Sequence, residues 1–566
     1  MSIVNYQLLN LKAGVVVRLP GIKAGDGISK SVQVEFGGLN RAIGAADGEI
    51  FDMRNMTGDH APVLAVRSRR SILSTPGAPT GAWKFDTLFS HEALWYASDI
   101  GVVCCDPGNG EAVYYSGLLP GHKIFTAIGD YVVIFPDKVA FDTVSKERKN
   151  LESSVSANSV QFTNGSIFGE DAEANTLIVK GVALNQFFKP GDGIEISGCS
   201  VFNENNKTAV IREISGNRMA FYEYTFKLGG EDHNVPHTEN YVLFKRTAPD
   251  LMFVCENENR LWGCDGNTIY ASKLGDPFNW NVFEGLGTDS WACDVGSPGK
   301  FTGCVSFMGY PIFFKEDQIY KVYGTLPSNY EVTPGPELGV MDGCGGSIAI
   351  ANETLYYLAR PGVVAYGGGV PRLVSAAFGA ERFRDACAGS DGLKYFISMV
   401  GTVSGQRLLY VYDSLRGFWH IEDDSPAVSF VRWRGGLYML NSVGLVWLVS
   451  GNRTGDNVNG YGEELVPWSV EFADWYDKSP NKKGVGKVQL RVELDPGASV
   501  EIFVQYDSDG VWRKIRWVMA STVKKSYYLP IIPRRTDHYR LKLTGYGGCR
   551  VFSLARDRYI GSELRV

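Results

Sequence analysis

The chain has 566 residues, of which 44% are hydrophobic and 21% charged, and its formal net charge is −6. This length exceeds what one hydrophobic core fills, so we expect more than one domain. The 66 glycines and the 12% of aromatic residues favour many short strands joined by tight turns. No stretch approaches the roughly 18 apolar residues of a membrane span, and no signal peptide is visible, so we expect no membrane span and synthesis in the cytoplasm.

Residues 1–80 contain stretches in which apolar and polar side chains alternate, such as 15–19 and 32–36. Alternation with period two is typical of half-buried strands. We therefore predict N-terminal strands that close or flank the domain that follows.

From residue 81 onward, one pattern occurs seven times: a short aromatic and β-branched strand, a tight turn and a second such strand. The first strands are 94–96, 131–134, 260–262, 312–314, 355–358, 395–398 and 437–440. Most successive copies begin about 40 residues apart, and this spacing is typical of the blades of a β-propeller. We predict a propeller of about seven blades, split into 81–151 and 247–463; the N-terminal strands complete a blade or add an eighth.

One interval is longer than the others by about 90 residues, and the excess falls at 152–246. This segment has strand patterns of its own at 176–179, 193–196, 208–211 and 219–222, and a strong turn signal at 190–193. We predict an inserted small β-barrel or sandwich, because insertion at a loop tip costs little loop-closure entropy.

Two turns of the propeller end in large rings: the turn 275–280, which ends in Trp280, and the turn 413–419, which ends in Trp419. We expect these rings to fill the core between sheets and not to form a ligand platform.

Residues 464–566 show seven short, largely alternating strand patterns with polar turns, which favours a C-terminal β-sandwich. Residues 482–566 hold 17 basic and 8 acidic residues, whereas the rest of the chain is acidic. A basic domain on an acidic body is compatible with nucleic-acid contact, with docking of an acidic partner, or with a solvated surface.

The sequence offers weak candidates for chemistry. His233 and His237 have a ligand-like spacing, but Pro236 opposes a helix there, so we expect solvated loop histidines. The run 507–510 resembles the opening of a calcium loop but lacks the later ligands, so we predict a hairpin turn.

Paired carboxylates occur at 231–232, 316–317 and 422–424, and we interpret them as solvated turn charges. The glycine-rich runs 343–346 and 367–369 are not followed by Lys-Ser/Thr, as a phosphate-binding loop requires. We therefore assign no catalytic, cofactor-binding or metal-binding residues and expect no enzyme activity and no cofactor. The ten cysteines, without a Cys-x-x-Cys pair, are expected to be buried reduced thiols.

Three stretches resemble a family of bacteriophage structural proteins, the tail hub or nozzle subunits also called DNA-stabilisation proteins. They are 47–56 with the basic run Arg67–Arg70 behind it, 259–280, and the ending 532–541 with 561–563. The resemblance covers both ends and the propeller but not the insertion, and no catalytic residues come with it.

This resemblance implies a homo-oligomeric, six-fold ring that extends or closes the DNA exit channel of a virion tail. Its implied partners are copies of itself, portal or adaptor proteins, fibres or spikes, and DNA that passes without sequence recognition. An acidic lumen would let DNA slide, because basic walls would hold phosphates. Two alternatives stay open: a tail-tip receptor-binding or fibre-anchoring protein, and a propeller glycan hydrolase.

Overall fold

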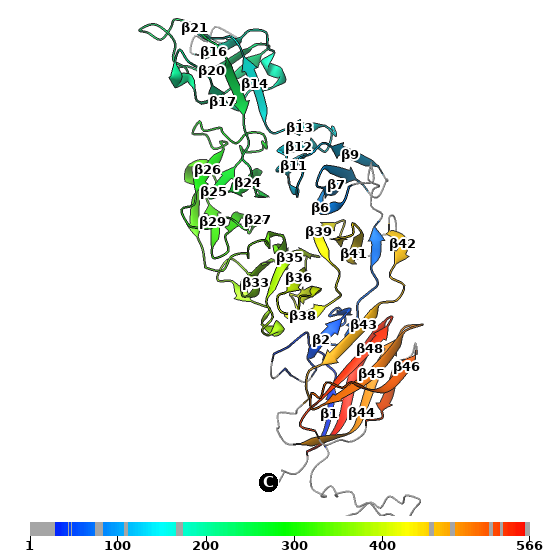
Figure 1. Cartoon of the computed structure of the whole chain (residues 1–566). Coiled ribbons are helices and arrows are strands. Elements are labelled where there is room, and N and C mark those ends of the chain that lie inside the picture. The colour runs from blue at the N-terminus through cyan, green and yellow to red at the C-terminus, as the bar shows by residue number, and fades with distance from the viewer. Residues whose placement is uncertain are drawn as a thin grey trace, which may run out of the picture.

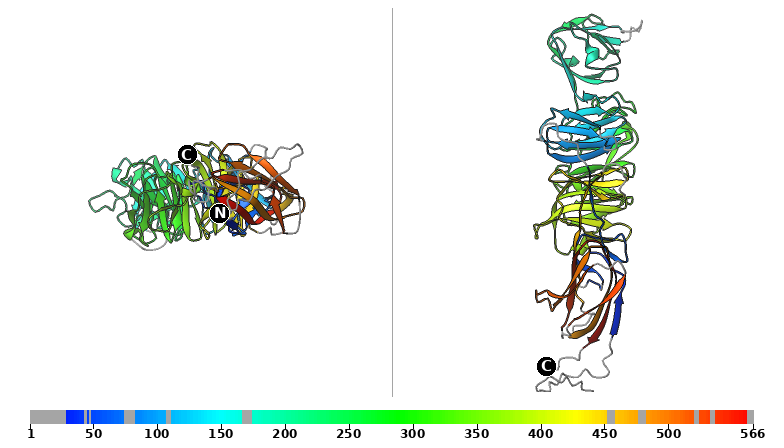
Figure 2. Two further views of the ribbon diagram at one scale, coloured as in Figure 1. Left: turned by 90° about the horizontal axis from the view of Figure 1, so that it is seen from below. Right: turned by 90° about the vertical axis from the view of Figure 1, so that its right-hand side faces the viewer.

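The computed structural model describes residues 29–42, 45–46, 48–73, 83–106, 111–165, 174–451, 458–475, 482–519, 524–531 and 536–560. The chain is all-β, and its parts are arranged in a column (Figures 1 and 2). A small β-domain lies at one end, the propeller in the middle and a β-sandwich at the other end. The expected strand at 15–19 and, from the family-like ending, residues 532–535 and 561–563 lie outside the described residues.

Among the described residues the propeller has seven blades, of which six are four-stranded antiparallel meanders and the seventh is a five-stranded sheet. Blades one to three are β6 (Phe85–His91), β7 (Ala93–Ser98), β8 (Gly101–Cys105), β9 (Ala112–Ser116); β10 (Ile124–Ile128), β11 (Tyr131–Phe135), β12 (Val139–Asp142), β13 (Arg148–Asn150); and β23 (Phe253–Asn257), β24 (Arg260–Asp265), β25 (Thr268–Ala271), β26 (Trp291–Asp294). Blades four to six are β27 (Gly303–Phe307), β28 (Tyr310–Phe314), β29 (Ile319–Tyr323), β30 (Glu331–Pro334); β31 (Ala349–Ala351), β32 (Thr354–Ala359), β33 (Gly362–Tyr366), β34 (Arg372–Leu373); and β35 (Phe383–Ser390), β36 (Lys394–Gly401), β37 (Arg407–Asp413), β38 (Phe418–Ile421).

Blade seven combines both parts of the chain. It contains β39 (Ala427–Trp433), β40 (Gly436–Asn441), β41 (Val446–Ser450), the N-terminal strand β5 (Ser71–Leu73) and β42 (Val458–Gly462). β5 lies between β41 and β42 and pairs antiparallel with both. The N-terminal strand therefore completes the seventh blade, and no eighth is added among the described residues.

The seven predicted hairpins are confirmed as the central strand pairs of the seven blades, from β7–β8 to β40–β41. Neighbouring sheets cover both faces of these strands, so they are almost wholly buried; every residue of Gly362–Tyr366 is buried. This explains why they read as near-continuous apolar runs.

The insertion has two antiparallel sheets and a hydrophobic core of its own. One sheet is β14 (Ser153–Ala157), β22 (Val242–Arg246), β17 (Gly193–Ser197) and β18 (Thr208–Val210). The other is β19 (Glu213–Ser215), β20 (Arg218–Tyr222), β16 (Ala174–Val179), β15 (Val160–Asn164) and β21 (His237–Glu239).

The sandwich is built from both ends of the chain, which differs from the expectation that residues 464–566 form it alone. One sheet is β2 (Ile50–Arg54), β43 (Pro467–Phe472), β48 (Tyr539–Tyr546), β45 (Ser499–Tyr506) and β46 (Arg513–Met519). The other is β3 (Met56–Thr57), β4 (Leu64–Val66), β49 (Cys549–Ile560), β44 (Lys483–Leu494) and β47 (Lys525–Leu529), with β1 (Ser29–Gln33) paired to β49. The seven predicted C-terminal strands are confirmed as β43 to β49; the N-terminal strands complete the two sheets because the C-terminal ones leave apolar edges that must be covered.

Helical structure among the described residues is limited to five single 3-10 turns. They are η1 (Leu184–Gln186), η2 (Asn203–Asn205), η3 (Pro327–Asn329), η4 (Gly345–Ser347) and η5 (Ala376–Phe378). No helix in the described part of the chain is long and apolar enough to cross a bilayer.

The two aromatic turns fill the core as expected. Trp280 is 2% exposed and packs edge-on against Phe135 of blade two. Trp419 is 1% exposed and packs against Phe378 and Tyr412.

Candidate functional site: the joint between propeller and sandwich

A buried network of charged groups connects the propeller to the sandwich. Arg70, which immediately precedes β5, is 3% exposed and donates hydrogen bonds to Glu422 and, at 2.6 Å, to Asp423. Arg67 is 7% exposed and forms a two-pronged pair with Glu463, at 2.6 and 2.7 Å. Arg67 and Arg70 together contact acids that follow the last strands of blade six and blade seven. The network therefore fixes the place where the chain leaves the sandwich and enters the propeller.

The network also reaches the sandwich directly. Arg67 Nε donates to the side-chain oxygen of Asn55 at 2.7 Å, and the Asn55 amide donates to the carbonyl oxygen of Pro467 in β43 at 2.7 Å. Asn55 has a positive φ of 56°, a backbone conformation that asparagine tolerates better than most residues.

Burial and charge act against each other on these groups. Burial would raise the pKa of Asp423, but Arg70 and Arg67 lower it below its usual value. Burial likewise would raise the pKa of Glu463, whereas Arg67 holds it below normal. Burial would lower the pKa of Arg70, but the charges of Glu422 and Asp423 raise it, so Arg70 stays charged at neutral pH.

A cleft of about 960 Å³ opens beside this network, between blade six and the outer face of the sandwich sheet that contains β2 and β46. One row of residues crosses that sheet in register: Arg54, Ser469, Thr544, Glu501 and Trp517. The propeller side contributes Gln406, Arg407, Leu408, Asp423 and Asp424. The cleft has a polar floor and an aromatic wall in which Trp517 and Tyr546 are 52% and 58% exposed.

A second joint holds the insertion against blade three. It unites the two turns that the sequence marks most strongly, 190–193 and 275–280. Asn279 donates to Asp192 at 3.0 Å and accepts the backbone N–H of Gly193 at 3.0 Å, and Lys273 donates to the carbonyl oxygen of Gly191 at 2.8 Å. Arg246, which ends β22 of the insertion itself, pairs with Asp192 at 2.6 Å and so holds the carboxylate that Asn279 contacts.

The carboxylate pairs of the sequence have different surroundings. Glu316 and Asp317 both pair with Arg360, at 3.3 and 3.4 Å, and remain largely accessible. The interpretation of Glu422 and Asp423 as solvated turn charges is wrong, because both are enclosed in the arginine network. Local sequence could not show this, since their partners lie more than 350 positions away.

The two loop histidines also differ from each other. His233 is exposed, as expected, but the side chain of His237 is only 10% exposed and stacks on Phe162 with ring centroids 4.9 Å apart. The expectation that both are solvated is therefore wrong for His237. Burial lowers its pKa, so it is held neutral.

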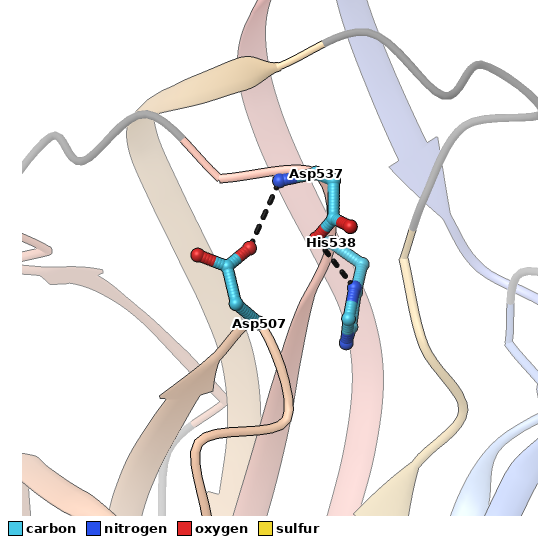
Figure 3. A group of neighbouring side chains, drawn as sticks. All are labelled: Asp507, Asp537 and His538. Atoms are coloured by element: carbon cyan, nitrogen blue, oxygen red, sulfur yellow. Dashed lines mark hydrogen bonds and ion pairs between the residues drawn. The ribbon is translucent and has the colours of Figure 1, made fainter.

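Asp507, Asp537 and His538 come together at one tip of the sandwich (Figure 3). The N–H of Asp537 donates to Asp507 at 2.9 Å, and His538 Nδ1 lies 2.7 Å from Asp537. His538 Nε2 lies 2.7 Å from the Ser508 hydroxyl, so both ring nitrogens have protein partners. The group ties the turn after β45 to the start of β48, and the predicted hairpin after residue 507 is confirmed by the pairing of β45 with β46.

Comparison with known proteins finds only distant structural likenesses. No protein-family model matches the sequence, and no curated protein matches it. Among solved structures, BamB from Moraxella catarrhalis matches at 10% identity and a TM-score of 0.33, over 68% of this chain and 99% of BamB. The Pan2 WD40 domain of Neurospora crassa matches at 9% identity and a TM-score of 0.34, over 68% of this chain and 98% of that domain. An oligogalacturonate lyase of Vibrio parahaemolyticus matches at 10% identity and a TM-score of 0.22, over 70% of this chain and 98% of the lyase. All three TM-scores lie below 0.5, and nothing about the function of this chain follows from these likenesses.

Proposed function

We propose that this protein is a structural subunit of a bacteriophage tail, a ring-forming component that extends or closes the DNA exit channel and anchors neighbouring tail proteins. The supporting observation is where the family-like stretches lie. Residues 48–56 and Arg67–Arg70 form the joint between sandwich and propeller, and 275–280 forms the joint between propeller and insertion. The residues that carry the resemblance thus hold three domains in fixed relation, which is what a mechanical subunit requires.

The charge distribution agrees with this role. Outside residues 482–566 the chain has a clear excess of acidic residues. An acidic surface facing the lumen repels phosphates and lets DNA pass without release of bound counterions. We infer that the acidic propeller body faces the channel and that DNA is not recognised by sequence.

We further propose that the protein is not an enzyme. The acids of the joint beside the cleft, Asp423 and Glu463, have arginine partners that hold them ionised, whereas a general acid in glycan hydrolysis needs a raised pKa. Incubation of the purified protein with bacterial surface glycans should release no reducing sugars. Release that is lost in a carboxylate variant of the cleft, such as Glu501→Gln, would contradict this part of the proposal.

Electron microscopy of the purified full-length protein tests the main proposal. We expect class averages of a ring with a central pore, and a reconstruction with an acidic lumen. A monodisperse monomer at all concentrations, or a pore ringed by lysine and arginine, would contradict it.

The cleft favours a second candidate, a tail-tip protein that binds a receptor or anchors a fibre. Its exposed Trp517 and Tyr546 are rings of the kind that dominate binding sites. Copy number separates the two functions, because a channel ring needs identical contacts that close, whereas a tip-binding module does not.

A further inference from the structure

Two cysteines from neighbouring blades contact each other inside the propeller. Cys255 belongs to β23, the first strand of blade three, and Cys304 belongs to β27, the first strand of blade four; the two blades follow each other around the ring (Figure 1). The thiol of Cys304 makes a hydrogen bond with the thiol of Cys255. Both residues are half-buried, and both are free thiols.

The register of the two strands explains why these thiols meet. Two positions further along each strand, the Ser306 hydroxyl donates to the side-chain oxygen of Asn257 at 2.7 Å. Side chains two positions apart point to the same face of a strand. Both contacts also join residues separated by the same number of positions, as two strands running side by side in one direction require. The two thiols are therefore part of a row of contacts that joins blade three to blade four.

The equivalent place between blades one and two holds a packed pair of aromatic rings. Phe89 of β6 and Cys255 both lie in the third residue pair before the turn to the next strand. Phe125 of β10 and Cys304 both lie in the fourth such pair. The rings of Phe89 and Phe125 stack with their centroids 5.3 Å apart. This place in the propeller thus brings two side chains into direct contact, and between blades three and four both of them are thiols.

A third thiol lies close to this pair. Cys264 of β24 is fully buried in the hydrophobic core against which Cys255 and Cys304 pack. Burial raises the pKa of both Cys264 and Cys304 well above the usual range of a thiol. A thiol that stays protonated attacks an oxidant slowly. We therefore expect the contact to persist as two thiols until an oxidant has acted on it for some time.

We propose that Cys255 and Cys304 form a disulfide that joins blades three and four when the protein leaves a reducing compartment. Glutathione and thioredoxin keep thiols reduced in the cytosol, so the pair should be open there and should close in an oxidising medium. The inference goes beyond the proposed function and does not depend on it.

Hydrogen peroxide is an oxidant small enough to serve as the probe. One thiol attacks a peroxide oxygen, the O–O bond breaks, and the hydroxide that leaves takes the thiol proton as water, which gives a sulfenic acid. The other thiol attacks this sulfur, the S–O bond breaks, and a second water leaves as the S–S bond forms. The two cysteines lose two electrons in total, and the peroxide gains them.

Peptide mapping of the full-length protein tests the disulfide directly. The native protein is treated with hydrogen peroxide, the remaining thiols are blocked with N-ethylmaleimide in denaturant, and tryptic peptides are analysed without reduction. The tryptic peptides 247–260, 261–273, 274–300 and 301–315 hold one cysteine each, so every pairing gives a different product. We expect 247–260 linked to 301–315, with the mass of the two reduced peptides less two hydrogen atoms.

Variants and melting curves supply a second measurement. Cys304→Ser should lose the linked peptides, whereas Cys293→Ser, which changes a half-buried thiol of β26 in the same blade, should keep them. Oxidised wild type should melt about 3 °C or more above the reduced protein, because the cross-link restricts the unfolded chain. A thiol reductant should reverse this shift, and Cys304→Ser should show none.

Other results would overturn the inference. A link between 247–260 and 261–273 would assign the bond to Cys255 and Cys264 instead. Sulfinic acid without a cross-link, or thiols that stay free after prolonged exposure, would show that the two sulfurs do not reach bonding distance. Linked peptides found only in covalent dimers would place the bond between chains. Each of these outcomes leaves the ring function standing, because the test does not require assembly.

Discussion

Replacing Arg70 with methionine should open the joint between propeller and sandwich. Methionine fills similar space without charge, so the change removes the cation but leaves the acids. Glu422 is 5% exposed, and in the described part of the chain Arg70 is its one ion-pair partner, whereas Asp423 keeps Arg67. Breaking a buried pair by removing one member costs about 3–5 kcal/mol, because the other charge stays buried and unpaired.

Hydrogen exchange measures this loss locally, which matters because a chain of several domains does not unfold in two states. A loss of about 3–5 kcal/mol corresponds to amide exchange that is roughly 10²- to 5 × 10³-fold faster. We expect this acceleration in peptides that cover β5 and β43, and no change in peptides of the insertion.

Two further variants bound the interpretation. Arg384→Met removes an exposed ion pair with Asp385 and should change the free energy of local opening, as measured by amide exchange, by less than about 0.5 kcal/mol. Arg70→Met/Glu422→Gln removes both charges and should recover much of the loss, because no buried charge is left unpaired. Exchange in Arg70→Met within threefold of wild type, or a double variant worse than the single one, would refute the reasoning.

The same joint gives a pH dependence. The folded-state pKa values of Asp423 and Glu463 lie below the ordinary values of these carboxyl groups, 3.8 and 4.5. Their contribution to stability is therefore complete above those values and is lost as the pH falls through the lower folded-state values. Exchange of the β43 peptides should accelerate below about pH 4 in the wild type, and less so in Glu463→Gln.

Three other variants have expected outcomes. Burial lowers the pKa of His420 to about 3, so on acidification the histidine of the unfolded chain takes up a proton first, and stability falls as the pH drops below 6.5. His420→Met should reduce this fall in melting temperature between pH 7 and pH 4. An unchanged slope would show that His420 is not its source. Ile72→Pro removes a ladder hydrogen bond inside β5 and should accelerate amide exchange in peptides of β41 and β42 far more than Ile72→Thr, which keeps the N–H. Equal acceleration by both variants would show that β5 pairing does not hold the ring. Asn279→Ala should speed trypsin cleavage at the insertion's base severalfold, with the exposed Asn234→Ala as control, and equal cleavage of both would mean that the second joint does not restrain the insertion.

The sequence predicted the seven blades because their signal is local. Strands such as β24 and β25 are separated by a short turn, so alternation, branching and turn residues all lie within one window. The C-terminal strands were predictable for the same reason.

The joints were not predictable, because they connect distant positions. Arg70 looked like one member of a basic run and Glu422 like one member of an acidic run, and nothing in either run indicates the other. Asn279 was part of a recognised turn, but its role in docking the insertion depends on Asp192, which lies in a separate domain. Strands β1 to β4 and β5 likewise showed strand character without showing which sheet they would join.

The position of β5 also sets the order of folding. Its partners in blade seven are synthesised about 370 residues later, which at typical rates of about 5–20 residues per second leaves β5 waiting for tens of seconds. The sandwich strands β1 to β4 wait longer still, for partners near the end of the chain. A chain cut short after blade six would leave both an open ring and a half-built sandwich, so neither the ring nor the sandwich is complete before synthesis has almost ended.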